Sequence, residues 1–172
     1  MLKKDKLRYN EYFDMQSIFD ELYQQSRNNN NFYKLMEVIG SKQNIRLAYR
    51  NLKGNTGSKT KGTDGKTIED ISKLNDEMLI KEVRARLEDY NPLPVRRVYI
   101  PKPGSDKKRP LGIPTIWDRL IQQCILQVLE PICEPKFHNH SYGFRPNRCA
   151  QQAILTALDI MNDGNDWIVD ID

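Results

Sequence analysis

The sequence predicts an α/β protein of the α+β kind, in which helices precede a short antiparallel β-hairpin and a final strand. Apolar residues recur at helical spacing through most of the first ninety residues. From Val95 the spacing changes to alternation, first in VRRVYI and then in KKRPLGI. The final run, WIVDID, alternates in the same way. With 172 residues and 38% hydrophobic content, the chain can bury the core of one domain or of two small ones.

Six helices are expected from the spacing of apolar residues. The first runs through NEYFDMQSIFDELYQQ, where Tyr12, Met15, Phe19 and Leu22 form one apolar stripe, and the asparagines from Asn28 end it. Capping residues and breakers place the other five at 32–39, from the cap Ser41 to about Leu52, from the cap Asn75 to about Tyr90, from the cap Thr115 to Pro131, and from about Asn147 to Asn162.

The β-hairpin is expected to carry a strongly basic turn. VRRVYI and KKRPLGI would pair across PKPGSD. The prolines in this stretch cannot donate to a ladder, so the pair should be short or lie at a sheet edge, and its turn should project. Lys102 and Arg109 flank this turn, and Lys107 and Lys108 lie on it.

The segment KGNTGSKTKGTDGK, residues 53–66, is expected to be a mobile basic loop without a regular element. Its GSKT resembles the end of a phosphate-binding P-loop, but Ser58 separates the glycine from the lysine and no apolar strand precedes it, so nucleotide hydrolysis is rejected. The composition fits a loop that contacts nucleic-acid phosphates through Lys59, Lys61 and Lys66, and it fits a plain linker about as well.

Charge is segregated along the chain. The overall net charge is +4, yet residues 41–110 hold seventeen basic and nine acidic side chains, whereas residues 111–172 hold four and eight. A positive field beside a negative one is expected of a protein that holds a polyanion next to a metal site. On charge alone, a basic surface that serves only solubility explains the pattern equally well.

Several classes of protein are excluded by the remaining composition. The three cysteines lack the paired spacing of a zinc site and leave an odd thiol, so zinc and disulfides are set aside. No membrane span or secretory signal is recognisable, so we expect a cytoplasmic protein, bacterial or organellar. His138 and His140 have no cysteine or carboxylate at ligand spacing, and we expect them to be loop or packing residues.

Two carboxylates share one face of the final run. Side chains on a strand alternate, so Asp170 and Asp172 point the same way. Neighbouring carboxylates on an apolar strand repel each other unless a cation lies near them, as in magnesium sites for phosphoryl transfer. A solvent-facing strand end is an equally good explanation. A strand this apolar needs neighbours, so we also expect that the protein was cut here.

Four motifs, in order, carry a family resemblance: YIPKPGSDKKRPLGIPT, DRLIQQCILQVLEPICEP, SYGFRPNR and WIVDID. They resemble those of a group II intron reverse transcriptase, the maturase family. The likeness covers about residues 45–172, and NTGSKTKGTDGKTIEDI resembles the family's basic N-terminal extension motif. It implies a right-hand polymerase that copies RNA into DNA with two Mg²⁺ ions and binds its own intron RNA to aid splicing and retrohoming. The implied partners are intron RNA, an RNA template with a DNA primer, and deoxynucleoside triphosphates.

The resemblance implies roles for the hairpin and for the SYGFRP loop. Lys102 and Arg109 match the fingers residues that grip the incoming triphosphate, and Lys108 would share the role of Arg109. The positions near the templating base would be Arg96, Ile113 and Pro114, for which strand packing is a nearly equal interpretation. Arg145 resembles a residue that supports the template and the junction of fingers and palm, and a buried structural arginine is the alternative.

The final residues match the first palm motif of the family. Asp172 matches its catalytic metal ligand, and Asp170 is the neighbouring carboxylate. The second carboxylate motif, Tyr-Ala-Asp-Asp in the family, lies beyond the sequence. We therefore expect the chain alone to be inactive, and to self-associate through an exposed apolar strand.

The implied organisation has four parts: an N-terminal helical segment (1–40), the extension motif and a helix (41–94), the reverse transcriptase fingers (95–166) and a truncated first palm strand (167–172). Two alternatives stay open. One is a non-catalytic RNA-binding splicing cofactor, and the other is a related CRISPR-associated or diversity-generating reverse transcriptase.

Overall fold

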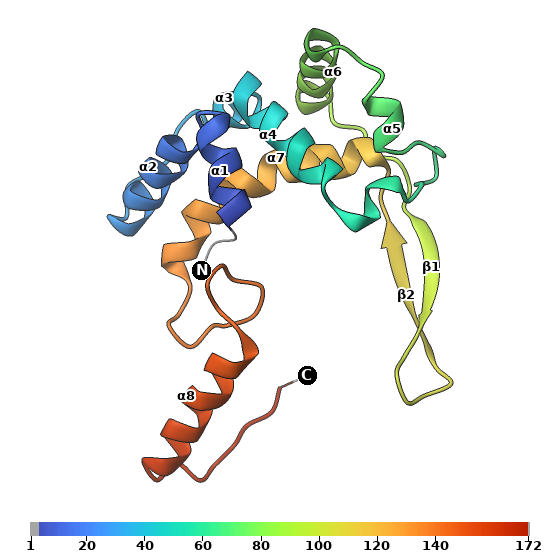
Figure 1. Cartoon of the computed structure of the whole chain (residues 1–172). Coiled ribbons are helices and arrows are strands. Elements are labelled where there is room, and N and C mark those ends of the chain that lie inside the picture. The colour runs from blue at the N-terminus through green and yellow to red at the C-terminus, as the bar shows by residue number, and fades with distance from the viewer. Residues whose placement is uncertain (1–3, 172) are drawn as a thin grey trace.

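The computed structural model of the chain describes residues 4–171. Figure 1 shows an arch whose top is built around helix α7 (Ile116–Cys133), with a β-hairpin projecting from one end and an arm that carries α8 (Ala150–Asn162) projecting from the other. The remaining elements are α1 (Lys4–Tyr12), α2 (Gln16–Arg27), α3 (Leu35–Ile39), α4 (Lys42–Lys53), the 3₁₀ turn η1 (Thr56–Lys59), α5 (Ile68–Ile71), α6 (Asp76–Glu88), β1 (Arg96–Pro101), β2 (Lys108–Ile113) and the 3₁₀ turn η2 (Glu134–Lys136). The mostly helical α+β fold with one antiparallel hairpin is confirmed.

The core lies around α7, against which α2 and α4 pack. Leu120, Ile121, Cys124 and Val128 of α7 are buried, as their helical spacing predicts. Burial raises the pKa of the Cys124 thiol to about 12 because the thiolate would lose its hydration, so this cysteine is a small core residue.

A polar cluster joins α4 to α7 inside this core. The amide of Asn44 donates to the carbonyl oxygens of Ile39 (2.8 Å) and Cys124 (3.0 Å), and the Gln127 amide donates to the Asn44 carbonyl (2.7 Å). Both amides are buried and hydrogen-bonded, so they fix how α4 lies on α7 without leaving orphaned groups.

Three helix caps agree with the sequence. The side chains of Ser41, Asn75 and Thr115 accept backbone N–H bonds at the starts of α4, α6 and α7. Pro131 does not end α7, which continues to Cys133. The final helix starts at Ala150 rather than Asn147, which has a left-handed backbone (φ 59°).

The first expected helix is two helices. Asp14 has a left-handed backbone (φ 55°), which separates α1 from α2. Tyr12 therefore leaves the apolar stripe and is 77% exposed, while Met15, Phe19 and Leu22 stay buried. The helix expected at 32–39 is likewise shorter, because Lys34 is left-handed (φ 59°) and α3 starts after it.

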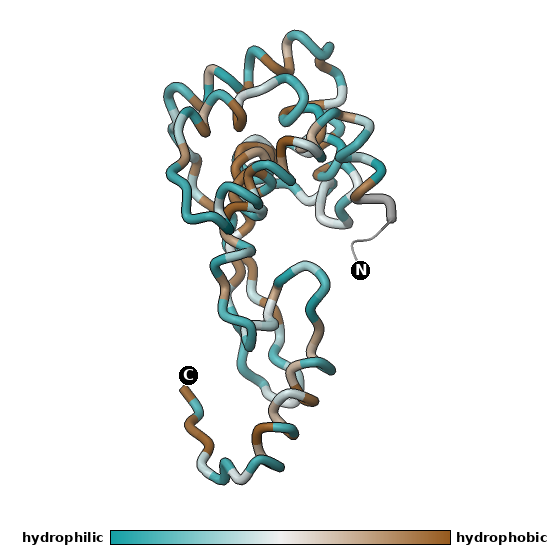
Figure 2. Tube along the Cα trace, turned by 90° about the vertical axis from the view of Figure 1, so that its left-hand side faces the viewer, coloured by the Kyte–Doolittle hydropathy of each residue, from teal (hydrophilic) through white to brown (hydrophobic). Residues whose placement is uncertain are grey.

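The strand expected at 167–172 is not formed, since residues 165–171 have no regular secondary structure. A strand requires a neighbour for its backbone hydrogen bonds, and the sheet within residues 4–171 has only β1 and β2. Apolar side chains are exposed on both faces that a strand would have here: Trp167 is 95% exposed and Ile168 is 76% exposed. Figure 2 shows this hydrophobic segment ending apart from the core. Asp172 lies outside the described residues.

Among residues 4–171, no helix is both long and apolar enough to cross a membrane.

Candidate functional site

The pairing of β1 with β2 sorts the hairpin side chains onto two faces. Arg96 is opposite Ile113, Val98 is opposite Leu111, and Ile100 is opposite Arg109. Residues directly opposite each other, and residues two apart, share a face of an antiparallel pair. The Lys102 N–H donates to the Lys107 carbonyl (2.9 Å), so this pattern extends into the turn.

One face, which we call the inner face, collects most of the expected hairpin site residues. Its members are Arg96, Val98, Ile100, Lys102, Lys107, Arg109, Leu111 and Ile113. The basic side chains lie at its tip and at its base, and apolar side chains lie between them. The sequence-based pairing of Lys102 with Arg109 beside the turn thus has a direct geometric basis.

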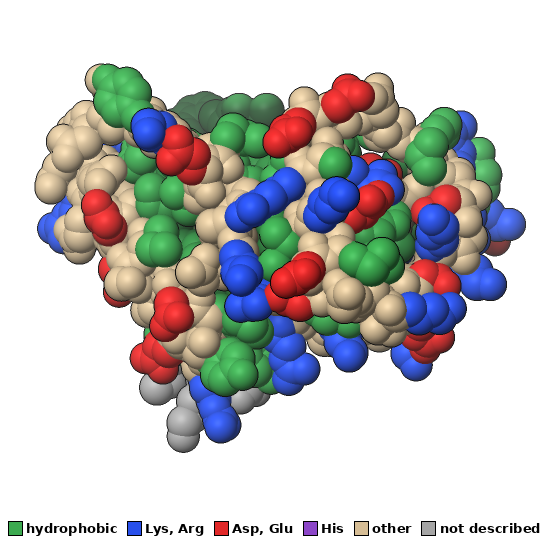
Figure 3. All heavy atoms as spheres, turned by 90° about the horizontal axis from the view of Figure 1, so that it is seen from above, with side chains coloured by type: hydrophobic (Ala, Val, Ile, Leu, Met, Phe, Trp, Pro, Cys, Tyr) green, Lys and Arg blue, Asp and Glu red, His purple; other side chains and the backbone are tan. Residues whose placement is uncertain are grey.

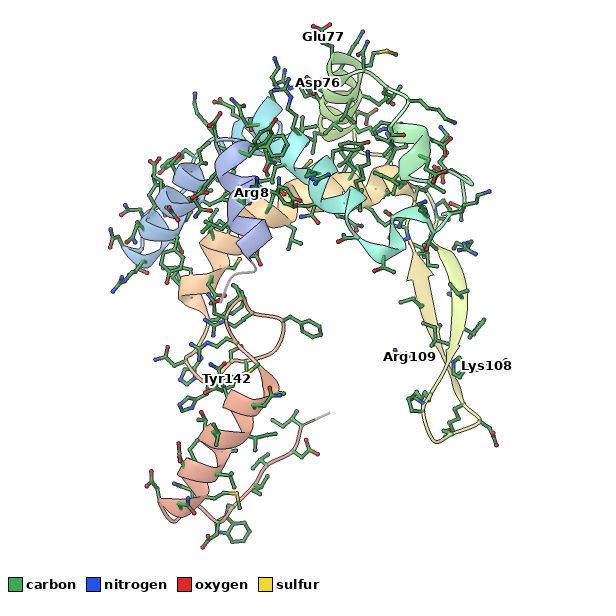
Figure 4. All side chains as sticks on the ribbon, viewed as in Figure 1. Arg8, Asp76, Glu77, Lys108, Arg109 and Tyr142 are labelled. Carbon is green, nitrogen blue, oxygen red and sulfur yellow. The ribbon has the colours of Figure 1, made fainter. Side chains whose placement is uncertain are left out.

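Lys108 lies on the opposite, outer face. It is opposite Pro101, one position out of phase with Arg109. Figure 4 shows Arg109 on the side of the hairpin that faces the C-terminal segment and Lys108 on the side away from it. This register speaks against the expectation that Lys108 shares the role of Arg109, because consecutive strand residues point to opposite faces.

The basic loop 53–66 is held against the base of the hairpin. The Arg96 Nε donates to the Lys61 carbonyl (2.9 Å), and the Thr63 hydroxyl donates to the Pro94 carbonyl (2.8 Å). A Cβ on Gly62 would lie 2.7 Å from the Cα of Thr115, so only glycine permits this approach. The loop was expected to lack a regular element, but it contains η1.

Arg119 of α7 fixes this loop from the other side. Its guanidinium donates to the carbonyl oxygens of Gly57 (2.7 Å) and Thr60 (2.5 Å), and partial burial lowers its pKa. No local pattern around Arg119 indicates this role, because both acceptors are backbone atoms some sixty positions away. The loop is therefore anchored rather than free along its length.

The three lysines of this loop differ in their contacts. Lys59 forms an exposed ion pair with Glu69 (3.1 Å). Lys61 and Lys66 are also exposed, and their ammonium groups have no ion pair within the described part of the chain. Lys61 is adjacent to Arg96 through its backbone, so the basic loop continues the charge at the base of the hairpin.

Ile113 and Pro114 are half-buried where β2 enters α7. The next residue, Thr115, donates its hydroxyl to Asp118 (2.6 Å), and the Tyr90 hydroxyl donates to the same carboxylate (3.3 Å). Desolvation, together with this carboxylate, raises the pKa of Tyr90. Sequence analysis did not single out Asp118, although Thr-x-x-Asp at a helix start resembles a capping box and could have indicated it. This cluster fixes the base of the hairpin on α7.

Arg145 lies in a network inside the arm. Its guanidinium pairs with Glu134 (2.8 Å), and its Nη1 donates to the carbonyl oxygens of His138 and Ser141 (both 2.9 Å). It also lies over the Phe137 ring, 5.1 Å from the centroid. These contacts correspond to the structural arginine that sequence analysis kept as an alternative.

The carboxylates expected to hold metal are only partly described. Asp170 is exposed on the final segment, and Asp172 is outside the described range. Within residues 4–171, no three His, Cys, Asp or Glu side chains gather in a way that could hold a metal ion. His138 and His140 stack edge to face with centroids 5.0 Å apart, and no carboxylate contributes to this pair.

The top of the arch has a cavity of about 620 Å³ beside α4, lined by three basic and two acidic side chains, so its charges nearly balance. Arg46 pairs with Asp76 and holds the pKa of that carboxyl below its usual range, and Arg50 donates to the Tyr9 hydroxyl (2.8 Å). Figure 3 shows basic and acidic side chains interspersed on this surface. The strongest unbalanced positive charge that the structure presents is on the hairpin and the loop at its base.

Comparison with known proteins agrees with this placement of charge. A family model described as "Reverse transcriptase (RNA-dependent DNA polymerase)" matches residues 100–172. The group II intron-encoded protein LtrA of Lactococcus lactis subsp. cremoris is 46% identical over 112 residues, which cover 64% of this chain and 18% of LtrA. Protein YkfC of Escherichia coli (strain K12) is 38% identical over 145 residues, 81% of this chain and 38% of YkfC. The putative COX1/OXI3 intron 1 protein of Saccharomyces cerevisiae is 28% identical over 155 residues, 90% of this chain and 18% of that protein.

The family model matched by residues 100–172 gives the class of this part of the chain as reverse transcriptase. Within that class, the named relatives support a segment of a group II intron reverse transcriptase and maturase. It spans about a fifth of the length of LtrA and less than two fifths of that of YkfC.

Proposed function

We propose that this chain provides the nucleotide-gripping and template-contacting part of an RNA-directed DNA polymerase. One observation carries the proposal: the strand register puts Arg109, Arg96 and Ile113 on a single face of a projecting hairpin, and the Lys102–Lys107 backbone hydrogen bond extends that face to Lys102. A triphosphate on that face would meet these cations, while the carboxylates proposed to hold metal belong to the final segment.

Lys102 and Arg109 would neutralise the triphosphate while the bond to the leaving pyrophosphate breaks. Arg109 offers a planar fork that suits two phosphate oxygens, and Lys102 offers a point charge. Lys107 lies opposite Lys102 and adds to the same field. These side chains are exposed, so the substrate does not have to displace an internal partner.

The template would cross the base of the inner face. Arg96, Ile113 and the adjoining Pro114 combine one cation with two apolar groups, which suits a phosphate and the face of a base. Arg96 is held by the Lys61 carbonyl, so the basic loop and the hairpin would contact the same strand. Arg145 would support the template indirectly, by holding the arm in place. Its N–H donors are engaged by partners within the protein.

Reverse transcriptases use divalent metal ions, and we propose that Mg²⁺ is held through Asp170 and Asp172. The carboxylate oxygens of aspartate are the ligands that Mg²⁺ prefers, so the donor type fits. Bound metal would activate the primer hydroxyl and stabilise the leaving group. The described residues bring no third metal-ligating side chain to Asp170, so we expect residues 1–172 alone not to extend a primer.

A primer-extension assay of a polymerase that contains these residues distinguishes an RNA-directed DNA polymerase from a non-catalytic RNA-binding protein. We expect DNA synthesis that depends on an RNA template and on Mg²⁺. A protein that binds a template and primer but incorporates no nucleotide would instead be an RNA-binding splicing cofactor.

The basic loop is proposed to bind intron RNA. Replacing Lys59, Lys61 and Lys66 together by alanine should weaken RNA binding and reduce the slope of log affinity against log salt by about 3, because each phosphate contact releases about one counterion. Fluorescence anisotropy with a structured RNA at several salt concentrations measures both quantities. An unchanged slope would remove the loop from the interface.

We also propose that the isolated chain self-associates. α8 has no buried residue, and Trp167, Ile168, Val169 and Ile171 are exposed, so the arm presents apolar surface rather than the strand edge expected from the sequence. Light scattering should show a mass that rises with protein concentration. A monomer of constant mass at high concentration would refute this proposal.

A further inference from the structure

The proposed polymerase reaction uses none of the residues on the outer face of the hairpin. By the same register it carries Arg97, Tyr99, Pro101, Lys108, Pro110 and Gly112. Neither strand contains an acidic residue, and the acidic residue nearest to these cations along the chain is Asp106 of the turn, two positions before Lys108. Val95 continues the face at its base, where a Cβ on residue 112 would lie only 3.0 Å from a methyl group of Val95.

Tyr99 is the centre of this face. It is opposite Pro110, it is 59% exposed, and its ring has no aromatic or cation contact within residues 4–171. Pro110 opposite it and Pro101 two positions along the same strand provide an apolar surround for a flat ring. A large aromatic side chain left open in such a setting can accept another ring by stacking.

Arg97 and Lys108 flank the ring, and within the described part of the chain neither forms an ion pair. The structure pairs neither with a carboxylate in the described range, whereas Arg86 and Arg145 elsewhere lie over aromatic rings and pair with glutamates. Arg97 is two residues from Tyr99 on the same strand face, about 6.6 Å along the strand. One nucleotide can therefore reach the ring with its base and a cation with its phosphate.

We propose that this outer face binds a single-stranded segment of RNA, with an unpaired base stacked on Tyr99 and phosphates held by Arg97 and Lys108. The inference rests on the proposed function, because it assumes that RNA is a ligand of this chain. It adds a second contact on the side of the hairpin opposite to the nucleotide. A duplex does not fit this chemistry, since its bases are already stacked and paired.

The test compares affinities of the 172-residue chain for an unstructured single-stranded RNA and for a fully paired RNA hairpin of equal length. Tyr99→Ala should weaken binding of the single strand about 5- to 100-fold, and Tyr99→Phe should retain most of it, since stacking requires only a ring. Arg97→Gln and Lys108→Gln should each lower the salt slope by about 1. Tyr33→Ala is the matched control, because Tyr33 is 80% exposed but lies between α2 and α3.

The outcomes separate this inference from the proposed function. If Tyr99→Ala binds the single strand normally while the triple lysine variant loses affinity, the proposed RNA binding by the basic loop is supported. The proposed RNA binding by the outer face is then refuted. Equal loss for single-stranded and paired RNA would overturn stacking. If the unmodified chain binds neither RNA, the proposed RNA binding fails and this inference fails with it.

Discussion

Replacing Lys102 or Arg109 by alanine, in a polymerase that includes this chain, is expected to slow nucleotide incorporation about 30- to 1,000-fold. Each side chain supplies positive charge where negative charge develops on the triphosphate, and one such preorganised group typically contributes about 2 to 4 kcal/mol to the transition state. Pre-steady-state incorporation with template and primer already bound measures the effect. The affinity for template should change little, since both residues lie at the tip of the hairpin.

Two charge-matched variants control for a general electrostatic effect. Lys81→Ala on α6 and Arg27→Ala on α2 each remove one exposed cation outside the hairpin. Both should incorporate nucleotides at the normal rate. Normal kinetics in Lys102→Ala and in Arg109→Ala would refute the role of the inner face.

Replacing Arg145 by alanine is expected to cost about 3 to 5 kcal/mol of stability, concentrated in the arm. The side chain is 7% exposed, and its partner Glu134 is 19% exposed, so removing the guanidinium leaves a nearly buried carboxylate without its charge partner. The carbonyl oxygens of His138 and Ser141 lose their donor at the same time. The loop that carries α8 should therefore open more often.

Hydrogen exchange measures this opening element by element. Tyr142 hydrogen-bonds to Thr156 of α8 (2.6 Å) and lies in the same loop, so α8 should lose protection together with residues 137–149, while α4 and α7 keep theirs. Glu134→Ala should reproduce the loss, and the double variant should cost less than the sum of the two. Unchanged exchange in α8 would show that Arg145 does not hold the arm.

Local patterns in the sequence were sufficient for most helix starts and for the hairpin. Ser41, Asn75 and Thr115 have the short polar side chains that accept the first free N–H groups of a helix, and each does so here. The hairpin followed from alternation and from the turn residues between the strands. These signals depend on neighbours in sequence, and therefore a single sequence can reveal them.

Contacts between distant parts of the chain were not predictable in this way. Arg119 binds backbone oxygens of a loop about sixty positions earlier, and backbone acceptors leave no mark on the sequence. The break at Asp14 depends on one left-handed residue within an otherwise helical pattern. Residues 167–171 alternate as a strand would, but a strand is formed by its partner, and the described residues offer none.

The candidate site shows both what local sequence patterns can predict and what they cannot. Sequence motifs proposed Lys102 and Arg109 as site residues, but only the register and its extension through the Lys102–Lys107 hydrogen bond put both on one face and Lys108 on the other. A shift of one residue in that register would exchange the two faces. The proposed roles of the three cations therefore depend on the pairing of Ile100 with Arg109. The composition of the turn does not reveal this pairing.

The most direct test of this account is to find which lysine meets the phosphate end of a bound nucleotide. A nucleotide with an amine-reactive aldehyde at the end of its phosphate chain can be bound with template and primer to a polymerase that contains this hairpin, trapped by reduction, and located by mass spectrometry. Because the inner face carries Lys102 and Lys107 and the outer face carries Lys108, we expect the label on Lys102 or Lys107. Labelling of Lys108, with Lys102 and Lys107 unmodified, would contradict the account.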